Sequence, residues 1–330
     1  MAKILLCSPM VDNQSGTYIH DSFIQLGHKV AFFDWRFITK EKGGQQNMNI
    51  EFLKAVDQLK PDLTLIIKGL GITGETIRKA KGIHNHKIVG WIFDVTLGGT
   101  FVKDVPPYVE FMKELDTFYT IDKSAIEELN SLGVTAKWLP EGCHIPAHKE
   151  SVFNSVQKKR WGADVVFLGS VGGIHKNREK ILEKLHEENI PYKIYGNVYY
   201  PPETEPIWVK DHHSGFEAVN DYHSLVCGCS KIVLGIDGWP DRDKSYSARL
   251  YRTLCAKGFY LTTHTKGIEE EFKIGEELET YKNEDELMEK LFKYLTEDEL
   301  REKIAEQGQK KVIDKHQFKD SLQIMINENL

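Results

Sequence analysis

The chain has 330 residues, in which 43 lysines and arginines oppose 49 aspartates and glutamates for a formal net charge of −6. At roughly 150 residues per domain this length predicts two domains, and the acidic balance argues against binding to nucleic acid through a large positive field, although a local basic groove stays open. Hydrophobic residues, at 41%, exclude a disordered chain, and no apolar run reaches the roughly 18–20 residues that span a bilayer.

Short apolar runs alternate with amphipathic helical stretches along the whole chain, which predicts an α/β protein with parallel sheets. The first half is expected to form about six strands, at residues 4–7, 30–34, 63–68, 88–94, 115–121 and 136–139. Helices are expected between them, at residues 17–26, 52–59, 76–80 and 124–132. The N-terminal run is too short for a signal peptide, so we interpret it as the first strand of a cytoplasmic protein.

A second α/β series follows the polar stretch 146–161, where we place the domain boundary, after residue 156. Strands are expected at 165–169, 192–195, 232–236 and 259–262, and helices at 177–188, 249–256 and from 284 onward. Open α/β sheets bind ligands outside the carboxyl ends of their strands. If both sheets point these ends at one cleft, each domain can hold one of two substrates, which favours group transfer over hydrolysis.

Two segments of the second half offer anion-binding chemistry. The strand at 165–169 runs into a glycine-containing loop, Gly169 to Gly173, whose amides and following helix could hold a phosphate beside Arg178. Cations also gather before and within the helix at 249–256, where a helix dipole normally disfavours them. The alternative interpretation of the glycine-containing loop is a tight turn without a ligand. The alternative interpretation of the cationic segment is a solvated basic face.

Three further patterns do not predict a metal site. Asp241-Arg242-Asp243 is interpreted as a turn, and the adjacent His212 and His213 as part of a loop, since neighbouring side chains point in different directions. The five scattered cysteines lack zinc-finger spacing and are expected to be reduced, mostly buried thiols. The aromatic run from Tyr199 to Trp208 either stacks a nucleobase or an acceptor sugar or is an ordered loop.

Residues 165–325 resemble the C-terminal domain of GT-B glycosyltransferases of the group 1 type, in particular the spore-maturation-protein-like branch. The matching segments there are Phe167-Leu168-Gly169-Ser170 with Arg178, Tyr222 with 231–236, Ser247-Ala248-Arg249-Leu250-Tyr251, 258–263, 267–272 and Tyr281. In the first half they are Gly90-Trp91-Ile92-Phe93-Asp94 and Leu139-Pro140-Glu141-Gly142-Cys143. The order and spacing of these segments extend over about 300 residues.

The resemblance implies two Rossmann-like domains facing a cleft: residues 1–156 on the acceptor side, 157–316 on the donor side, and a last helix, 317–330, packing back on the first domain. It implies a hexosyl- or pentosyltransferase that uses a nucleotide-diphosphate-sugar, UDP-linked, without a metal or other cofactor. The donor-binding residues would be Gly169, Ser170, Gly172, Arg178, Lys244, Ser247, Arg249, Glu269 and Glu270.

On the acceptor side, Asp94 is the first candidate for the base or orienting group, because it ends an apolar strand before a glycine-containing loop. His20 is a second catalytic candidate, with a packed or surface histidine as its alternative. The first loop adds Asp12, Ser15 and Gly16 as acceptor-side residues.

The sequence departs from the family at the donor helix. Relatives commonly carry a glutamate that grips the ribose and another eight positions earlier, whereas this chain has Arg252 and Lys244 there. Retention or inversion therefore stays open, as do an epimerase or hydrolase of the same fold and a non-catalytic binding protein. The acceptor could be a glycan, a lipid-linked saccharide, a protein, a small molecule or a hydroxymethylated DNA base, and the oligomeric state is not predicted.

Overall fold

The computed structural model describes residues 1–11, 15–94 and 106–330, which form two compact units. Unit 1 comprises Met1–Glu141, Arg242–Ser245 and Phe318–Leu330, and unit 2 comprises Gly142–Asp241 and Tyr246–Gln317. The sequence-based boundary lay fifteen residues later, after residue 156 instead of Glu141. The difference arises because α7 (Ile145–His148) and α8 (Ser155–Trp161) both pack on α11 (Asp221–Cys229) of unit 2.

Unit 1 is built on a parallel sheet of six strands, as the sequence predicted, and the strand order is β2-β1-β3-β4-β5-β6. Its strands are β1 (Lys3–Cys7), β2 (Lys29–Phe33), β3 (Leu63–Ile67), β4 (Lys87–Ile92), β5 (Thr117–Thr120) and β6 (Ala136–Trp138). Every residue of β3 is buried, which is typical of a parallel strand covered on both faces.

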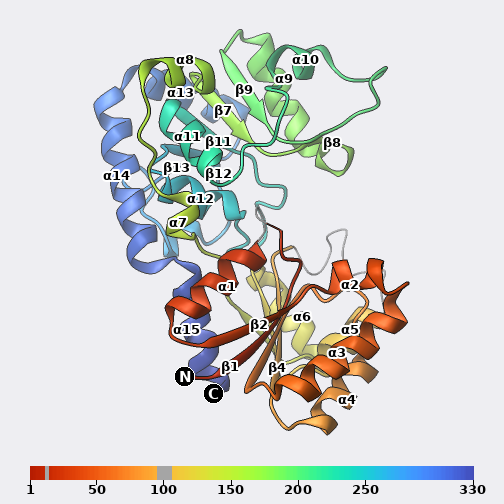
Figure 1. The fold of residues 1–330 in the computed structure, drawn as a ribbon. Helices are drawn as coiled ribbons and strands as arrows, with labels where there is room; N and C mark the ends of the chain where they lie inside the picture. Colours follow the sequence, from red (N-terminus) through yellow and green to blue (C-terminus); the bar gives the residue numbers. More distant parts are fainter. Residues whose placement is uncertain (12–14, 95–105) are drawn as a thin grey trace. The chain divides into compact units, whose positions relative to one another are not determined.

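Helices cover both faces of the unit 1 sheet. They are α1 (Ser15–Gln25), α2 (Trp35–Glu41), α3 (Gln45–Leu59), α4 (Gly74–Ile83), α5 (Pro106–Lys113), the 3₁₀ turn η1 (Lys123–Ala125), α6 (Ile126–Ser131) and α15 (Phe318–Asn329). Figure 1 shows α1 beside α15 on one face, with α3, α4 and α5 on the other. The Phe318 ring of α15 lies 6.1 Å from the rings of both Tyr18 and Trp91, so the last helix forms part of this unit's core.

Unit 2 contains a five-stranded parallel sheet in the order β13-β12-β11-β7-β9 and a small parallel pair, β10-β8. The strands are β7 (Val165–Leu168), β8 (Val171–Gly172), β9 (Tyr192–Tyr195), β10 (Val198–Tyr199), β11 (Ile232–Gly235), β12 (Tyr260–Thr263) and β13 (Glu279–Tyr281). Together the two parallel sheets confirm the predicted α/β fold class.

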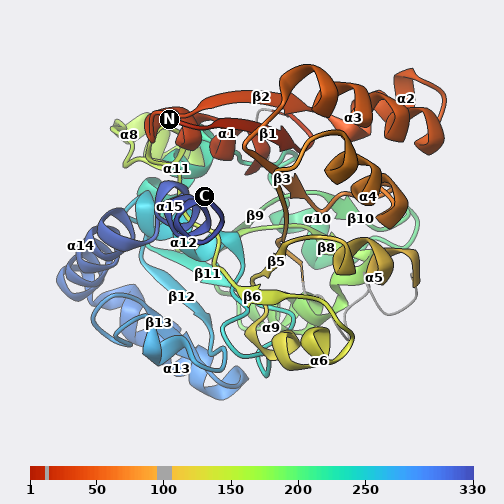
Figure 2. The same cartoon turned by 90° about the horizontal axis from the view of Figure 1, so that it is seen from below.

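The remaining helices of unit 2 are η2 (Gly173–Arg178), α9 (Glu179–Glu187), α10 (Ile207–His212), α12 (Ala248–Cys255), η3 (Ile268–Glu270), α13 (Glu284–Thr296) and α14 (Asp298–Lys315). Figure 2 shows α13 beside β13, and α14 packs on α12 and α13. All five cysteines are buried free thiols, as predicted. Within the described ranges no helix is both long and apolar enough to cross a membrane.

Candidate anion site at the end of strand β7

The strand order of unit 2 reverses between β7 and β11. From β7 the chain passes through α9 to β9 on one side, and it then returns to β11 and β12 on the other side. Such a switch point opens a crevice at the carboxyl ends of the two strands, where α/β proteins bind ligands. Arg178, just before α9, and Arg249, in the first turn of α12, both reach this place.

Arg249 lies across the end of β7. Its Nε donates a hydrogen bond to the carbonyl of Leu168, and the side chain is 9% exposed. A Cβ at Gly169 would lie 2.6 Å from Nη2 of Arg249, so a glycine is needed for this close approach. Ser247 caps α12 by accepting a hydrogen bond from the Arg249 amide at 3.3 Å, which fixes the start of the helix.

Arg178, at the end of η2, also reaches the carboxyl end of β7. Its Nη1 donates to the Ser170 carbonyl at 2.6 Å. The guanidinium carbons of Arg178 and Arg249 lie 5.5 Å and 5.0 Å from the centre of the Phe167 ring. Nε of Arg178 and Nη1 of Arg249 are buried and have no hydrogen-bond partner among the described residues. Two converging cations with open donors form a site for an anion.

The electrostatics agree with this geometry. Burial, together with the charge of Arg249, lowers the pKa of Arg178 to about 9, while Asp237 and Tyr260 oppose the shift. Burial raises the pKa of Asp237, against the opposing effect of the two arginines. Like charges held together in a partly dry environment cost free energy. A bound anion, such as a diphosphate, would remove that cost.

Two residues near this site were not predicted from the sequence. Asp237 lies two residues after the end of β11, as Asp94 lies two residues after the end of β4 in the first half. His175 lies in η2, and burial and the charges of Arg178 and Arg249 lower its pKa. The sequence signal that could have indicated His175 is its position between the glycine-containing loop and Arg178. The predicted residues lie in the segment from the end of β7 to η2 or at the start of α12: Gly169, Ser170, Gly172, Arg178, Ser247 and Arg249.

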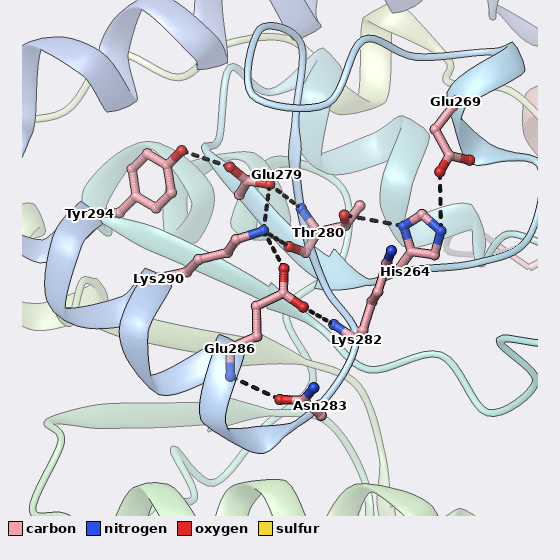
Figure 3. Close-up of polar contacts among 9 residues, drawn as sticks. All are labelled: His264, Glu269, Glu279, Thr280, Lys282, Asn283, Glu286, Lys290 and Tyr294. Atoms are coloured by element: carbon pink, nitrogen blue, oxygen red, sulfur yellow. Dashed lines mark hydrogen bonds and ion pairs between the residues drawn. The ribbon is translucent and has the colours of Figure 1, made fainter.

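Glu269 and Glu270 lie further along the same sheet edge, in η3 after β12, and both are exposed. Glu269 Oε1 is 3.1 Å from Nε2 of His264, whose Nδ1 lies 3.3 Å from Thr280 Oγ1 (Figure 3). A pocket of about 520 Å³ opens here, lined by Pro240, Asp241, Thr263, His264, Lys266, Gly267, Glu269 and Lys282. Glu269 therefore lines a pocket at the ends of β12 and β13, apart from the β7 switch point.

Lys244 packs within unit 1. Its Nζ lies 5.0 Å from the centre of the Trp138 ring, and its carbonyl accepts a hydrogen bond from Trp138 Nε1 at 3.3 Å. The neighbouring Asp243 and Arg242 also contact this unit: Asp243 lies 3.5 Å from the Lys123 ammonium, and Arg242 lies 3.3 Å from Asp122. Lys244 therefore belongs to unit 1, whereas Arg178 and Arg249 belong to unit 2.

The acceptor-side candidates lie in unit 1. Asp94 follows β4, and its carboxylate forms an ion pair with Lys68 at 2.6 Å. His20 packs edge-on against Phe32 of β2, with the ring centres 6.2 Å apart. Ser15 Oγ donates to the buried carboxylate of Glu141 at 3.1 Å, and Gly16 is buried in the first turn of α1. Asp12 lies outside the described residues.

The adjacent His212 and His213, from which no metal site was predicted, each contact a backbone carbonyl. His212 Nδ1 lies 3.0 Å from the Tyr192 carbonyl, whereas His213 Nε2 lies 2.8 Å from the Gly196 carbonyl, so the two rings point to different groups. In the part of the chain that the structure describes, no three histidine, cysteine, aspartate or glutamate side chains gather as a metal site would require.

Comparison with known proteins gives the fold and a family match for part of the chain. Residues 177–327 match the model of a family described as glycosyl transferase-like. The fold matches the HepE protein of Anabaena in complex with UDP, at 11% identity over 99% of both chains and a TM-score of 0.68. It matches sucrose-phosphate synthase of Thermosynechococcus elongatus at 9% identity over 99% of this chain and 98% of that chain, with a TM-score of 0.72. The chain has the GT-B fold, and residues 177–327 match a glycosyl transferase-like family.

A glycosyltransferase from Rickettsia africae also shares the fold, at 10% identity over 98% of this chain and 97% of that chain, with a TM-score of 0.66. By sequence, none of the curated proteins matches. Arg252, the residue that departs from the expected glutamate of the donor helix, lies in α12. Burial and, after it, the charge of Arg252 lower the pKa of the neighbouring His148 and His223, so both imidazoles are neutral beside this arginine at pH 7.

Proposed function

We propose that this chain is a glycosyltransferase that transfers a sugar from a UDP-linked donor to an acceptor hydroxyl without a metal ion. The observation that carries the proposal is the arginine pair at the switch point of unit 2. Arg178 and Arg249 converge over Phe167 with buried N–H groups that have no partner among the described residues. A diphosphate has the charge and the oxygen acceptors to use these donors.

The arginine pair also suits the chemistry of the transfer. The bond between the anomeric carbon and the diphosphate oxygen breaks, and that oxygen takes the electron pair, while the acceptor oxygen forms the new bond and loses its proton. Charge therefore grows on the departing diphosphate in the transition state. Two guanidinium groups already held by the Leu168 and Ser170 carbonyls can stabilise this charge without reorganisation.

For the acceptor we propose a hydroxyl group of a glycan, a small molecule or a hydroxymethylated DNA base. Asp94 is our candidate to orient this hydroxyl and to take its proton, with His20 as the second candidate. The position of Asp94 at the carboxyl end of β4 supports this role, because side chains at strand ends line the ligand crevices of α/β sheets.

The experiment is to follow UDP release from UDP-glucose in EDTA, with and without a mixture of saccharide and hydroxymethylated DNA acceptors. We expect release that depends on an acceptor, and we expect Asp94→Asn to reduce it about 100-fold or more while leaving UDP binding unchanged. Equal turnover without an acceptor would replace transfer by hydrolysis or epimerisation. A requirement for added Mg²⁺ or Mn²⁺ would contradict the metal-independent mechanism.

A further inference from the structure

Tyr199 is an exposed aromatic side chain on a rigid support. Its exposed fraction is 55%, although the residue belongs to strand β10. β10 pairs in parallel with β8, with Val198 opposite Val171 and Tyr199 opposite Gly172. The backbone of Tyr199 is therefore fixed to the loop that follows β7.

The residues around Tyr199 fit closely against the paired strands β8 and β10. Gly172 has φ of +80°, and a Cβ there would lie 2.9 Å from the Tyr200 ring and 3.0 Å from the Tyr199 carbonyl carbon. The Tyr200 ring packs perpendicular to that of the buried Trp208, 6.4 Å away. Tyr200 and Trp208 therefore anchor the segment from inside, and Tyr199 is left facing solvent. Of the aromatic run in the sequence, Tyr199 is the residue available to a ligand.

His175 connects Tyr199 to the anion site. The rings of His175 and Tyr199 lie 6.2 Å apart at an angle of 35°. His175 is three residues before Arg178 in η2, at a kink where its own backbone is non-helical. The charges of both arginines also act on its imidazole. The exposed ring of Tyr199 and the half-buried ring of His175 thus lie near the proposed diphosphate position.

We propose that Tyr199 and His175 form a shelf on which the transferred sugar of the donor stacks, and that this shelf determines which sugar is accepted. This inference rests on the proposed function. An aromatic ring offers a flat apolar face to the C–H groups of a pyranose. The transferred sugar is bonded directly to the diphosphate, whereas the nucleobase is separated from it by the ribose. The proximity of the shelf to Arg178 therefore favours the sugar over the base.

The test is a calorimetric titration of UDP and of UDP-glucose into the full-length wild type and into Tyr199→Ala, Tyr199→Phe and Phe292→Ala. Phe292 is the matched control, because it is an aromatic residue of unit 2 with an exposed fraction of 57% on α13. For Tyr199→Ala we expect UDP-glucose to bind about tenfold more weakly, with UDP affinity unchanged. Tyr199→Phe and Phe292→Ala should bind both ligands as the wild type does.

The outcomes separate this inference from the proposed function. If Tyr199→Ala weakens UDP and UDP-glucose equally, the shelf holds the nucleobase and the sugar assignment is overturned. If neither affinity changes, Tyr199 does not contact the donor at all. If the wild type itself binds neither ligand, the donor assignment of the proposed function fails, and the shelf fails with it.

Discussion

Gly169 shows how one residue without a side chain shapes the anion site. Arg249 can lie across the end of β7 because the space next to Leu168 contains only a hydrogen atom. The φ angle of Gly169 is not in the left-handed region, so the backbone itself would accept alanine. The glycine is therefore required by the approach of Arg249 and not by the turn.

We predict that Gly169→Ala displaces the Arg249 guanidinium and weakens UDP binding about tenfold, through the loss of roughly one charged hydrogen bond. Titration calorimetry measures the affinity, and urea denaturation measures the free energy of unfolding, which should change by less than about 1.5 kcal/mol.

Gly82→Ala is the control, since a Cβ there meets nothing within 4 Å and the residue lies in α4. It should leave UDP affinity unchanged. Wild-type affinity in Gly169→Ala would show that the position of Arg249 does not matter for the donor.

At the scale of elements, the apolar strands were predictable because parallel strands buried on both faces leave a continuous apolar signal. β13 (Glu279–Tyr281) lacks this signal and was missed. Its buried Glu279 carboxylate accepts from Tyr294 at 2.7 Å and Lys290 at 3.0 Å, both on α13 (Figure 3). α2 was missed as well, because Asp34 caps that helix by accepting from the Phe37 amide instead of extending β2.

The sequence predicted some residues of the candidate site and misplaced or missed others. Arg178 and Arg249 could be found because each follows a strand and a loop with recognisable chemistry. The position of Lys244 could not, since the path of a loop depends on its tertiary partners, here Trp138 of unit 1. His175 carried only a weak local signal, because its place in the candidate site depends on Tyr199 and Arg249, which are distant in the sequence.

The end of α14 makes unit 2 sensitive to acid. His316, which follows this helix, is buried between Phe272, whose ring centre is 5.1 Å away, and Tyr251 of α12. Burial lowers the pKa of His316 to about 4, Glu271 opposes the shift, and Lys311 and Lys315 add to it. Below about pH 6.5 the unfolded state therefore binds a proton that the folded state does not, so stability falls as the pH falls toward 4.

We predict that His316→Leu reduces this acid sensitivity. Urea denaturation at pH 7.5 and at pH 5.0 gives the free energy of unfolding at each pH. The loss on acidification should be smaller in the variant than in the wild type by on the order of 1–2 kcal/mol. Equal losses in both proteins would mean that His316 is not protonated differently on unfolding.

At the scale of the whole molecule, each of the two units has its own parallel sheet and its own core. The chain does not fill them in simple succession, because residues 242–245 and helix α15 return to unit 1. The complete anion site, including Arg178, Arg249, Phe167 and Asp237, belongs to unit 2. Donor binding should therefore depend on side chains of this unit.

The most direct test of the donor assignment is a titration of UDP into the full-length protein in EDTA, comparing the wild type with Arg178→Met and Arg160→Met. Arg160 is the control, because its exposed guanidinium lies 4.7 Å from the Trp161 ring, on another element of unit 2. We predict that the wild type and Arg160→Met bind UDP equally and that Arg178→Met binds it about 10–100-fold more weakly. Wild-type affinity in Arg178→Met, or no binding by the wild type, would contradict the assignment of the arginine pair to the diphosphate.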